Sequence, residues 1–309
     1  MLRGEKILVT GVTGVVAGDI ARNLAADNEV WGMARLADPT QRDALTAQGI
    51  RPVAVDFGNP DFSDTPDDFT YVLHFAWMRG TLAQQDHAMR VNVQGPGLLL
   101  QHCRKAKGAL IVSSQGVYAP DPDPLHHYTE SDPVGRAFSA YAQTSPACKL
   151  GLESVARFCA EAFDLPVTIA RLNTVLGPLN AYHGVHAAKI LRGEPIIVPH
   201  DPNLHSPICH EDMIWQVEPL VKSASRHALV TNWCGDEVIS TQETTALLGE
   251  WSGVTARTEV VTVPGAPAGN PNDAARRLSI TGPSRVKVRD ALRVVHGKVT
   301  AAVAAAGES

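Results

Sequence analysis

Residues 6–18 have the sequence KILVTGVTGVVAG, a short apolar run that leads at once into a glycine-rich turn. The run Lys6–Thr10 has the length and the Ile, Leu and Val content of a buried strand. Gly11 and Gly14 permit a tight turn, and the small Ala17 permits close packing of a following helix on the strand. We therefore predict a strand, a turn and a helix whose first backbone amides are free to bind a phosphate group.

The same alternation of strand and helix continues through the first half of the chain. Further strands are predicted where short apolar runs are bounded by Gly, Asp or Pro, at Glu29–Ala34, Arg51–Asp56, Tyr71–Ala76, Ala109–Ser113 and Val167–Leu172. Helices are predicted between them at Asp19–Asp27, Gln84–Lys107 and Pro146–Phe163. This order is typical of α/β proteins with a doubly wound parallel (Rossmann) sheet, which binds its ligand at the carboxyl ends of the strands.

The composition of the sequence changes after residue 176. Helix candidates become fewer, and Pro, His and Asn become frequent. We predict a Rossmann dinucleotide-binding domain over residues 1–176 and a smaller substrate-binding portion over residues 177–309. Part of that portion, about residues 206–236, is expected to return to the Rossmann sheet.

Composition argues against several classes of function. The 309 residues are 44% hydrophobic and 19% charged, with a net charge of -5. This balance gives no basic surface for nucleic acid or for an anionic membrane. The sequence has neither a signal-peptide pattern at its start nor an apolar run of membrane-spanning length, so we expect a cytoplasmic protein. The five cysteines form no C-x-x-C pair, which favours free thiols over disulfides or a zinc site, and no bound metal is expected.

The glycine-rich turn and the ends of the next strands favour a dinucleotide cofactor. Arg35 follows the second strand, where a carboxylate would suit the ribose 2′-hydroxyl of NAD and a guanidinium suits a 2′-phosphate. We therefore expect NADP(H), with NAD as the alternative. Asp56 either accepts a hydrogen bond from the adenine or serves as a turn residue. The residues expected to bind the cofactor on this reasoning are Gly11, Thr13, Gly14, Val15, Val16, Arg35, Asp56 and Phe57.

Several short motifs recur in an order that resembles the extended short-chain dehydrogenase/reductase family, in its NAD-dependent epimerase/dehydratase branch. The resemblance covers nearly the whole chain. After the turn it rests on Val72–Ala76, Asn92–Gly95, Val112–Tyr118, Lys149–Glu153, Ala170–Pro178 and Pro207–Asp212. No single motif is specific, but their shared order and spacing are.

The resemblance implies catalytic roles for particular residues. Ser114 matches the hydroxyl that bonds the reacting oxygen of the substrate, and Lys149 matches the lysine that holds the nicotinamide ribose. Asn92 matches an asparagine that is often part of a proton relay. Taken alone, each of these could be an ordinary strand-end or helix residue. Residues that the resemblance places along the cofactor are Phe75, Ala76, Trp77, Lys149, Asn173 and Val175. It also implies a homodimer that packs through the helices at Gln84–Lys107 and Pro146–Phe163.

The sequence departs from the family at the expected catalytic tyrosine. The family pairs Tyr and Lys four residues apart, which puts both side chains on one helix face. Here Ser145 stands four residues before Lys149, and Ser145-Pro146 is typical of an N-cap followed by Pro at the first helical position. Tyr141 lies two helical turns before Lys149, roughly 12 Å along a continuous helix, but a preceding loop could fold it back. Other candidates for the proton donor are a water, Tyr128, Tyr182, His126, His127, His183 and His186.

These features lead to one main functional hypothesis. We expect an NADP(H)-dependent oxidoreductase acting on a carbonyl, an alcohol or an activated alkene. The substrate is expected to be a small or medium organic molecule, because no cluster of basic residues for a nucleotide-sugar diphosphate is evident. Trp77 offers an apolar wall for it, and Arg79 is either an anion contact or a surface residue. The alternatives are a non-redox isomerase, lyase or epimerase with a tightly held cofactor, and a non-catalytic NADP(H) sensor.

Overall fold

The computed structural model describes residues 2–135, 139, 142–177 and 179–307, and it divides into two compact units. The first unit comprises residues 1–117, 139–171 and 214–231, and the second comprises residues 118–138, 172–213 and 232–309. The units are thus interleaved along the chain. The predicted division between residues 176 and 177 stays a prediction.

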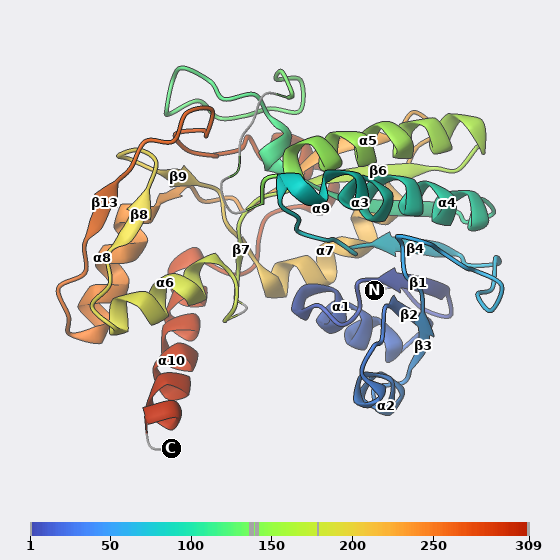
Figure 1. The fold of residues 1–309 in the computed structure, drawn as a ribbon, viewed down its shortest axis with the longest axis horizontal. Helices are drawn as coiled ribbons and strands as arrows, with labels where there is room; N and C mark the ends of the chain where they lie inside the picture. The colour runs from blue at the N-terminus through green and yellow to red at the C-terminus, as the bar shows by residue number, and fades with distance from the viewer. Residues whose placement is uncertain (1, 136–138, 140–141, 178, 308–309) are drawn as a thin grey trace. The chain divides into compact units, whose positions relative to one another are not determined.

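A seven-stranded sheet forms the centre of the first unit (Figure 1). Its order is β11-β6-β5-β4-β1-β2-β3, and β1 pairs in parallel with both β2 and β4. The strands are β1 (Lys6–Thr10), β2 (Glu29–Ala34), β3 (Ile50–Ala54), β4 (Tyr71–His74), β5 (Gly108–Ser114), β6 (Val167–Leu172) and β11 (Leu229–Trp233). The prediction of a doubly wound parallel sheet is therefore confirmed, and the predicted bounds of β1, β2 and β6 are the observed ones.

Helices pack on both faces of this sheet. Figure 1 shows α4 (Gly95–His102) and α5 (Ser145–Ala162) on one face and α1 (Val15–Ala25) on the other. Leu8, Val72 and Ile111 of the central strands are fully buried in one apolar cluster with Leu152 and Ala156 of α5. Because each large apolar side chain buried in this way stabilises the fold by roughly 1.5–3 kcal/mol, this cluster anchors the strand ends that carry the predicted site.

One predicted helix has different bounds in the structure, and one helix was not predicted. The helix expected at Asp19–Asp27 begins at Val15, because the extended backbone of Gly14 already caps it. A second, unpredicted helix, α2 (Pro39–Ala47), follows an N-cap in which the Asp38 carboxylate accepts a hydrogen bond from the amide of Thr40. An Asp-Pro pair is a known start signal, so the sequence did carry evidence for it.

The long helix predicted at Gln84–Lys107 is wrong as one element. The structure has a 3-10 turn (Leu82–Gln84), α3 (Gln85–Met89), a π-helical turn (Arg90–Gln94) and α4, which ends at His102. In the π-helical turn the amide of Gly95 donates to the carbonyl of Arg90, five residues back. The next residue, Pro96, has no amide to donate, which removes one α-helical hydrogen bond and explains the wider turn before it.

The second unit is built from short elements around its own apolar cluster. Helices α6 (Tyr182–Leu191), α8 (Thr241–Ser252) and α10 (Val288–Gly307) contribute Ile190, Leu248 and Leu292 to it. The remaining elements are β7 (Val175–Leu176), β8 (Ile196–Val198), β9 (Leu204–His205), β10 (Ile208–Cys209), β12 (Ile239–Ser240), β13 (Thr258–Val260) and α9 (Ala275–Thr281), and α7 (His210–Lys222) spans residues of both units. Within the described residues, no helix combines the length and apolar character needed to cross a bilayer.

Candidate active site

The glycine-rich turn between β1 and α1 is held against the end of β4. Gly11 has φ +71°, and a Cβ there would lie 2.8 Å from the Cα of Ala76. Both the backbone angle and the close approach therefore require glycine at this position. The amide of Gly14 then donates to the carbonyl of Gly11 at 2.8 Å, and α1 starts at the next residue. No side chain caps α1 and its first turn carries no acidic residue, so the start of this helix remains suited to an anionic group.

The Thr10 hydroxyl fixes the backbone that faces this turn. It accepts hydrogen bonds from the amides of Phe75 and Ala76, both at 3.1 Å. The hydroxyl also forms a hydrogen bond with Nδ1 of His74, 2.9 Å away. His74 is only 1% exposed, and burial lowers its pKa to about 3, so its ring is neutral. The predicted cofactor-lining residues Phe75 and Ala76 are thus rigidly placed beside Gly11.

The other residues predicted to bind the adenosine half lie at the ends of β2 and β3. Arg35 follows β2 directly and is exposed, and no hydrogen bond or ion pair involves its side chain among the described residues. Asp56 accepts a hydrogen bond from the amide of Gly58 at 2.9 Å. This bond is the role in a turn that the sequence allowed for Asp56. Its proposed bond to adenine stays a prediction. Phe57 is buried, and its ring contacts the His74 ring edge-on at a centroid distance of 5.6 Å.

Asn92 lies in the π-helical turn and is 1% exposed. Its Oδ1 accepts from the amide of Met78 at 2.8 Å, and its Nδ2 donates to the carbonyl of the same residue at 2.9 Å. The side chain thus fixes the segment that follows β4. The predicted place of Asn92 in a proton relay stays a prediction.

Lys149 has three close neighbours in the first unit. Its Nζ donates to the carbonyl of Val112 at 2.7 Å and lies 3.7 Å from the centroid of the Trp77 ring. The side chain is buried, and this burial lowers the pKa of Lys149 to about 7, partly offset by the nearby carboxylate of Glu153. The lysine therefore changes charge close to neutral pH. The contact with Trp77 was not foreseen from the sequence, which gives no sign of the pairing.

The two serines at the end of β5 have different partners. Ser113 is buried and donates to Oε1 of Glu153 at 2.6 Å. That carboxylate also accepts two hydrogen bonds from Arg171, at 3.0 and 2.9 Å, and forms a buried ion pair with it. Ser114 is half-buried, and its hydroxyl oxygen accepts from the amide of Gly116 at 3.1 Å. Ser114 is thus the more accessible of the two hydroxyls, two residues along β5 from the carbonyl that binds Lys149.

The start of α5 differs from the prediction. Ser145 is not the N-cap: the helix begins at Ser145, and Thr144 precedes it as the cap. Thr144 is fixed before the helix because its amide and its hydroxyl both donate hydrogen bonds to the backbone carbonyl of Gly80. Pro146 still falls in the first turn, where its missing amide costs nothing. Tyr141 lies outside the described residues.

The other candidate proton donors lie in the second unit. Tyr128 is buried, stacks on Tyr118, and its hydroxyl accepts from the amide of Asp121 at 2.9 Å. His126 bonds the carboxylate of Asp132 at 3.0 Å. Both side chains thus have structural partners.

Asn173, predicted to line the cofactor, is also in the second unit. Its Nδ2 donates to the carbonyl of Asn270 at 2.7 Å and to the side chain of Asn272, and its Oδ1 accepts from the amide of Thr174. The side chain therefore already holds the surrounding backbone. Val175 is half-buried in β7. The predicted cofactor contacts of these two residues stay predictions.

A polar cluster surrounds Tyr182 in the second unit. Its hydroxyl bonds Thr241 at 2.8 Å, and its ring lies within 5.3 Å, centroid to centroid, of three imidazoles: His183, His186 and His205. Burial lowers the pKa of His183 to about 3 and those of His186 and His205 to about 4. The cluster is therefore uncharged at neutral pH. Among the described residues, no group of three or more His, Cys, Asp or Glu side chains is placed to hold a metal ion.

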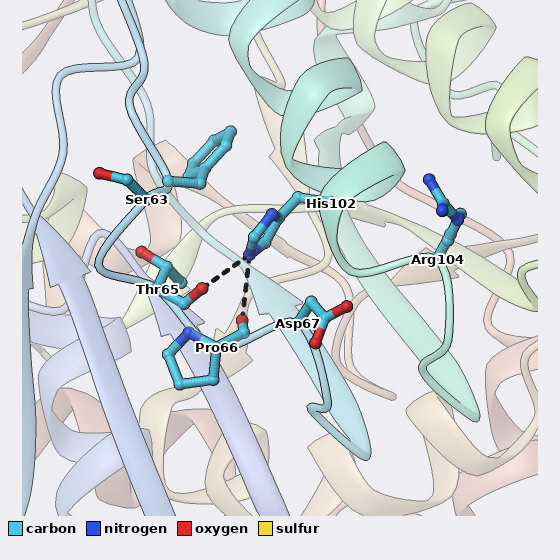
Figure 2. Close-up of a pocket in the computed structure, with 7 residues that line it drawn as sticks. Ser63, Thr65, Pro66, Asp67, His102 and Arg104 are labelled. Carbon is cyan, nitrogen blue, oxygen red and sulfur yellow. Dashed lines mark hydrogen bonds between the residues drawn. The ribbon is translucent and has the colours of Figure 1, made fainter.

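An open depression of about 570 Å³ lies elsewhere on the first unit (Figure 2). Figure 2 shows His102 in its wall, with Nε2 donating to the carbonyls of Thr65 and Pro66. Its lining residues are Phe62, Ser63, Thr65, Pro66, Asp67, His102 and Arg104. None of the residues predicted for the site lines it, so it is separate from the β1–α1 turn and from Lys149.

Comparison with known proteins gives a family and a fold. The model of the NAD dependent epimerase/dehydratase family matches residues 7–210. No curated protein matches the sequence significantly. Bacillus cereus UDP-glucuronic acid 4-epimerase, solved with UDP-glucuronic acid and NAD, is 20% identical with a TM-score of 0.80, over 96% of this chain and 99% of that chain.

Two further solved structures have the same fold. The UDP-N-acetylglucosamine 4-epimerase of Methanobrevibacter ruminantium is 18% identical with a TM-score of 0.81, over 97% of this chain and 100% of that chain. The Thermus thermophilus UDP-glucose 4-epimerase, solved with NAD, is 18% identical with a TM-score of 0.76, over 96% of this chain and 99% of that chain. At such identities the likeness shows the fold alone.

Proposed function

This chain belongs to the NAD-dependent epimerase/dehydratase family, and from that premise we propose that it is an NADP(H)-dependent oxidoreductase. Its substrate would be a small or medium organic molecule with a carbonyl, an alcohol or an activated alkene. The observation that carries the proposal is the buried Lys149, whose Nζ donates at 2.7 Å to the carbonyl of Val112 in β5, the strand that also carries the half-buried Ser114. A lysine is rarely buried without a task, because burial penalises its charge.

The first unit has the features that a dinucleotide requires. Gly11 lets the β1–α1 turn approach the end of β4, and the uncapped start of α1 offers amides to a pyrophosphate. Phe75 and Ala76 are held in place for the nicotinamide half by the Thr10 hydroxyl. When bound, the nicotinamide supplies the hydride chemistry. The protein would position the cofactor and the substrate, stabilise developing charge and supply a proton.

Arg35 supports NADP(H) over NAD(H). Its exposed guanidinium has no acidic partner among the described residues, so it is available to the 2′-phosphate that distinguishes the two cofactors. Several structures with this fold contain NAD. Titration with NADPH and NADH therefore distinguishes this chain from them.

Two side chains are proposed to act on the reacting atoms. The Ser114 hydroxyl would hydrogen-bond the substrate oxygen, and its present partner, the Gly116 amide, leaves its proton free to donate. Lys149 would hold the nicotinamide ribose and stabilise negative charge nearby. Ser145 provides no phenol, so the proton would come from Tyr141, which lies outside the described residues, or from a water.

The substrate proposal rests on the lack of a phosphate-binding cluster in the sequence, because a diphosphate favours Arg and Lys. Among the proteins with this fold are 4-epimerases of UDP-glucuronic acid and UDP-N-acetylglucosamine. We propose that this chain differs from them in substrate class.

A second candidate function is epimerisation or dehydration with a retained cofactor. The family description and the epimerases of the same fold favour it. An epimerase or dehydratase with a tightly held cofactor would need the same cofactor cradle. A non-catalytic NADP(H) sensor is less well supported, because a sensor needs neither Ser114 nor a buried Lys149.

The proposed setting is the cytoplasm, and the proposed assembly is a homodimer. All five cysteines are free and buried, as suits a reducing compartment. On α4 and α5, Leu98 is 48% exposed and Phe158 is 65% exposed, whereas Leu99 faces the core. These exposed side chains support the implied dimer contact through the two helices.

Cofactor titration followed by turnover assays tests the proposed function. Purified wild type, Ser114→Ala and Lys149→Met would be titrated with NADPH and NADH, then assayed by nicotinamide absorbance on ketones, aldehydes, enones and secondary alcohols. We expect tighter NADPH binding and turnover that both variants lose. Binding without any absorbance change would favour the epimerase or dehydratase alternative, which a mass- or NMR-based product assay would then detect. No binding of either cofactor would refute both.

A further inference from the structure

The Lys149 ammonium has an aromatic partner that is not a tyrosine. Nζ lies 3.7 Å from the centroid of the Trp77 ring, which comes from the segment after β4 rather than from α5. On another side, Nζ donates to the Val112 carbonyl at 2.7 Å. An indole face is the strongest aromatic partner for a cation, more so when both groups are withdrawn from water.

We propose that Trp77 is the positioning residue of Lys149: its indole and the Val112 carbonyl together hold Nζ at the end of β5. This proposal rests on the proposed function, in which Lys149 serves the cofactor and the substrate. Of the three N–H directions of an ammonium, the carbonyl takes one and the ring face covers another. One direction is left for the ribose or the substrate. Lys149 is thus held in position although residue 145 provides no tyrosine hydroxyl.

Other charged and titratable groups also face Lys149. Glu153 and Cys148 of α5 favour its charged form, and burial opposes it. His74, at the end of β4, is a neutral ring whose own protonation is disfavoured by Lys149. Glu153 is largely committed to Arg171 and Ser113. Trp77 is therefore the only partner of Nζ, among the described residues in direct contact with it, that stabilises the cation through a ring face.

This arrangement makes Trp77 more than a packing residue, and the two roles have different consequences. The ring does also pack against the apolar clusters of the first unit. If packing were its only role, replacing it would lower stability and, by reducing the burial of Lys149, would leave the pKa of the lysine unchanged or raise it. If it holds the ammonium, removing the ring face removes a contact made only by the charged form. Lys149 would then lose its proton at lower pH.

Intrinsic fluorescence against pH tests this without cofactor or substrate. The protein has five tryptophans, and a cation over one indole alters its emission. We expect wild type to show a step near pH 7, where Lys149 changes charge. The step should vanish in Lys149→Met and in Trp77→Phe. It should persist in the matched control Trp31→Phe, whose ring lies over Lys6 and Arg51 instead.

The pH profile of turnover supplies the second measurement. Trp77→Leu should move the midpoint assigned to Lys149 to lower pH by about one unit, whereas Trp77→Phe, which keeps a weaker ring face, should move it less. Circular dichroism would confirm that both variants fold, and Trp77→Phe suffices if the leucine variant does not. A wild-type fluorescence step that survives in Lys149→Met, or no step at all, would overturn the proposal. A normal step in a protein that turns over nothing would instead refute only the proposed function.

Discussion

The side chain of Asn92 holds the backbone of Met78 from both sides, accepting from its amide at 2.8 Å and donating to its carbonyl at 2.9 Å. This pair places the segment that carries Trp77 after β4. It also explains why an asparagine is suited to the π-helical turn, since an amide side chain offers a donor and an acceptor on two separate atoms at one end.

Replacing Asn92 should therefore destabilise the fold. Asn92→Leu keeps the volume but leaves the Met78 amide and carbonyl without partners, at a cost of about 2 kcal/mol in the free energy of unfolding. Urea unfolding followed by circular dichroism measures it. Gln94→Leu, at an exposed position of the same turn, is the matched control. Equal stability of wild type and Asn92→Leu would show that the bidentate contact contributes nothing.

Gly11 is predicted to be irreplaceable for two separable reasons. Gly11→Ala would place a Cβ 2.8 Å from the Ala76 backbone and would also strain a residue at φ +71°. Gly4 has φ +66° with open space around it, so Gly4→Ala carries the strain without the clash. We expect Gly4→Ala to cost about 1 kcal/mol and to bind cofactor normally. Gly11→Ala should cost more and abolish cofactor binding in a fluorescence titration; similar behaviour of the two variants would contradict this.

Arg35 should decide between the two cofactors. Arg35→Ser is expected to weaken NADPH binding by about tenfold to a hundredfold, the value of one charge-assisted contact, and to leave NADH binding unchanged. Calorimetric or fluorescence titration with both cofactors measures the ratio. Arg104→Ser serves as the control, since Arg104 lines the separate depression. An equal loss of NADPH and NADH affinity would count against a 2′-phosphate contact.

Lys149→Met should stabilise the protein while removing its activity. Burial lowers the pKa of Lys149 from 10.5 to about 7, so between these values the unfolded chain holds a proton that the folded chain has released. Stability therefore rises with pH through this window, and below it the buried ammonium keeps its full cost. We expect Lys149→Met to raise the free energy of unfolding by about 1–2 kcal/mol near pH 6, after the lost contacts of Lys149 are counted. The increase of stability with pH should also be smaller in this variant.

Urea unfolding at several pH values between 6 and 10 would follow this effect, with cofactor absent so that linkage to binding does not intervene. A loss of stability at pH 6 in Lys149→Met would mean that the contacts with Val112 and Trp77 outweigh the cost of burying the charge.

The buried histidines should make the fold sensitive to acid. The pKa of His183 is lowered to about 3 and those of His186 and His205 to about 4, all from 6.5, chiefly by burial. As pH falls below 6.5 the unfolded chain binds protons that the folded chain does not, so stability is lost down to about pH 4 for His186 and His205 and to about pH 3 for His183. Thermal unfolding at stepped pH should show a falling Tm across this range. His183→Leu should reduce the slope, and the exposed control His227→Leu should not.

Much of the first unit could be predicted from the sequence because its signals are local. The runs at β1, β2 and β6 are short, apolar and bounded by turn residues, and their predicted bounds are the observed ones. The glycine spacing after β1 likewise predicts a turn that only glycine permits. The predicted helices were wrong or missing where one local sequence pattern masked another. Pro96 interrupts an apolar pattern that otherwise suggests one long helix, and Asp38-Pro39 opens a helix with a weak apolar face.

The sequence by itself determined the parallel α/β fold and the glycine turn, whereas Ser114 and Lys149 became candidate residues through the resemblance to the dehydrogenase/reductase family. The fold and the turn depend on residue types at fixed spacing, which can be read directly from the sequence. Only the tertiary structure decided that Asn92 is committed to Met78, that Ser113 rather than Ser114 bonds Glu153, and that Lys149 lies against Trp77. The physical reason is that partners and charge states follow from burial among residues distant in sequence, and no local pattern encodes that environment.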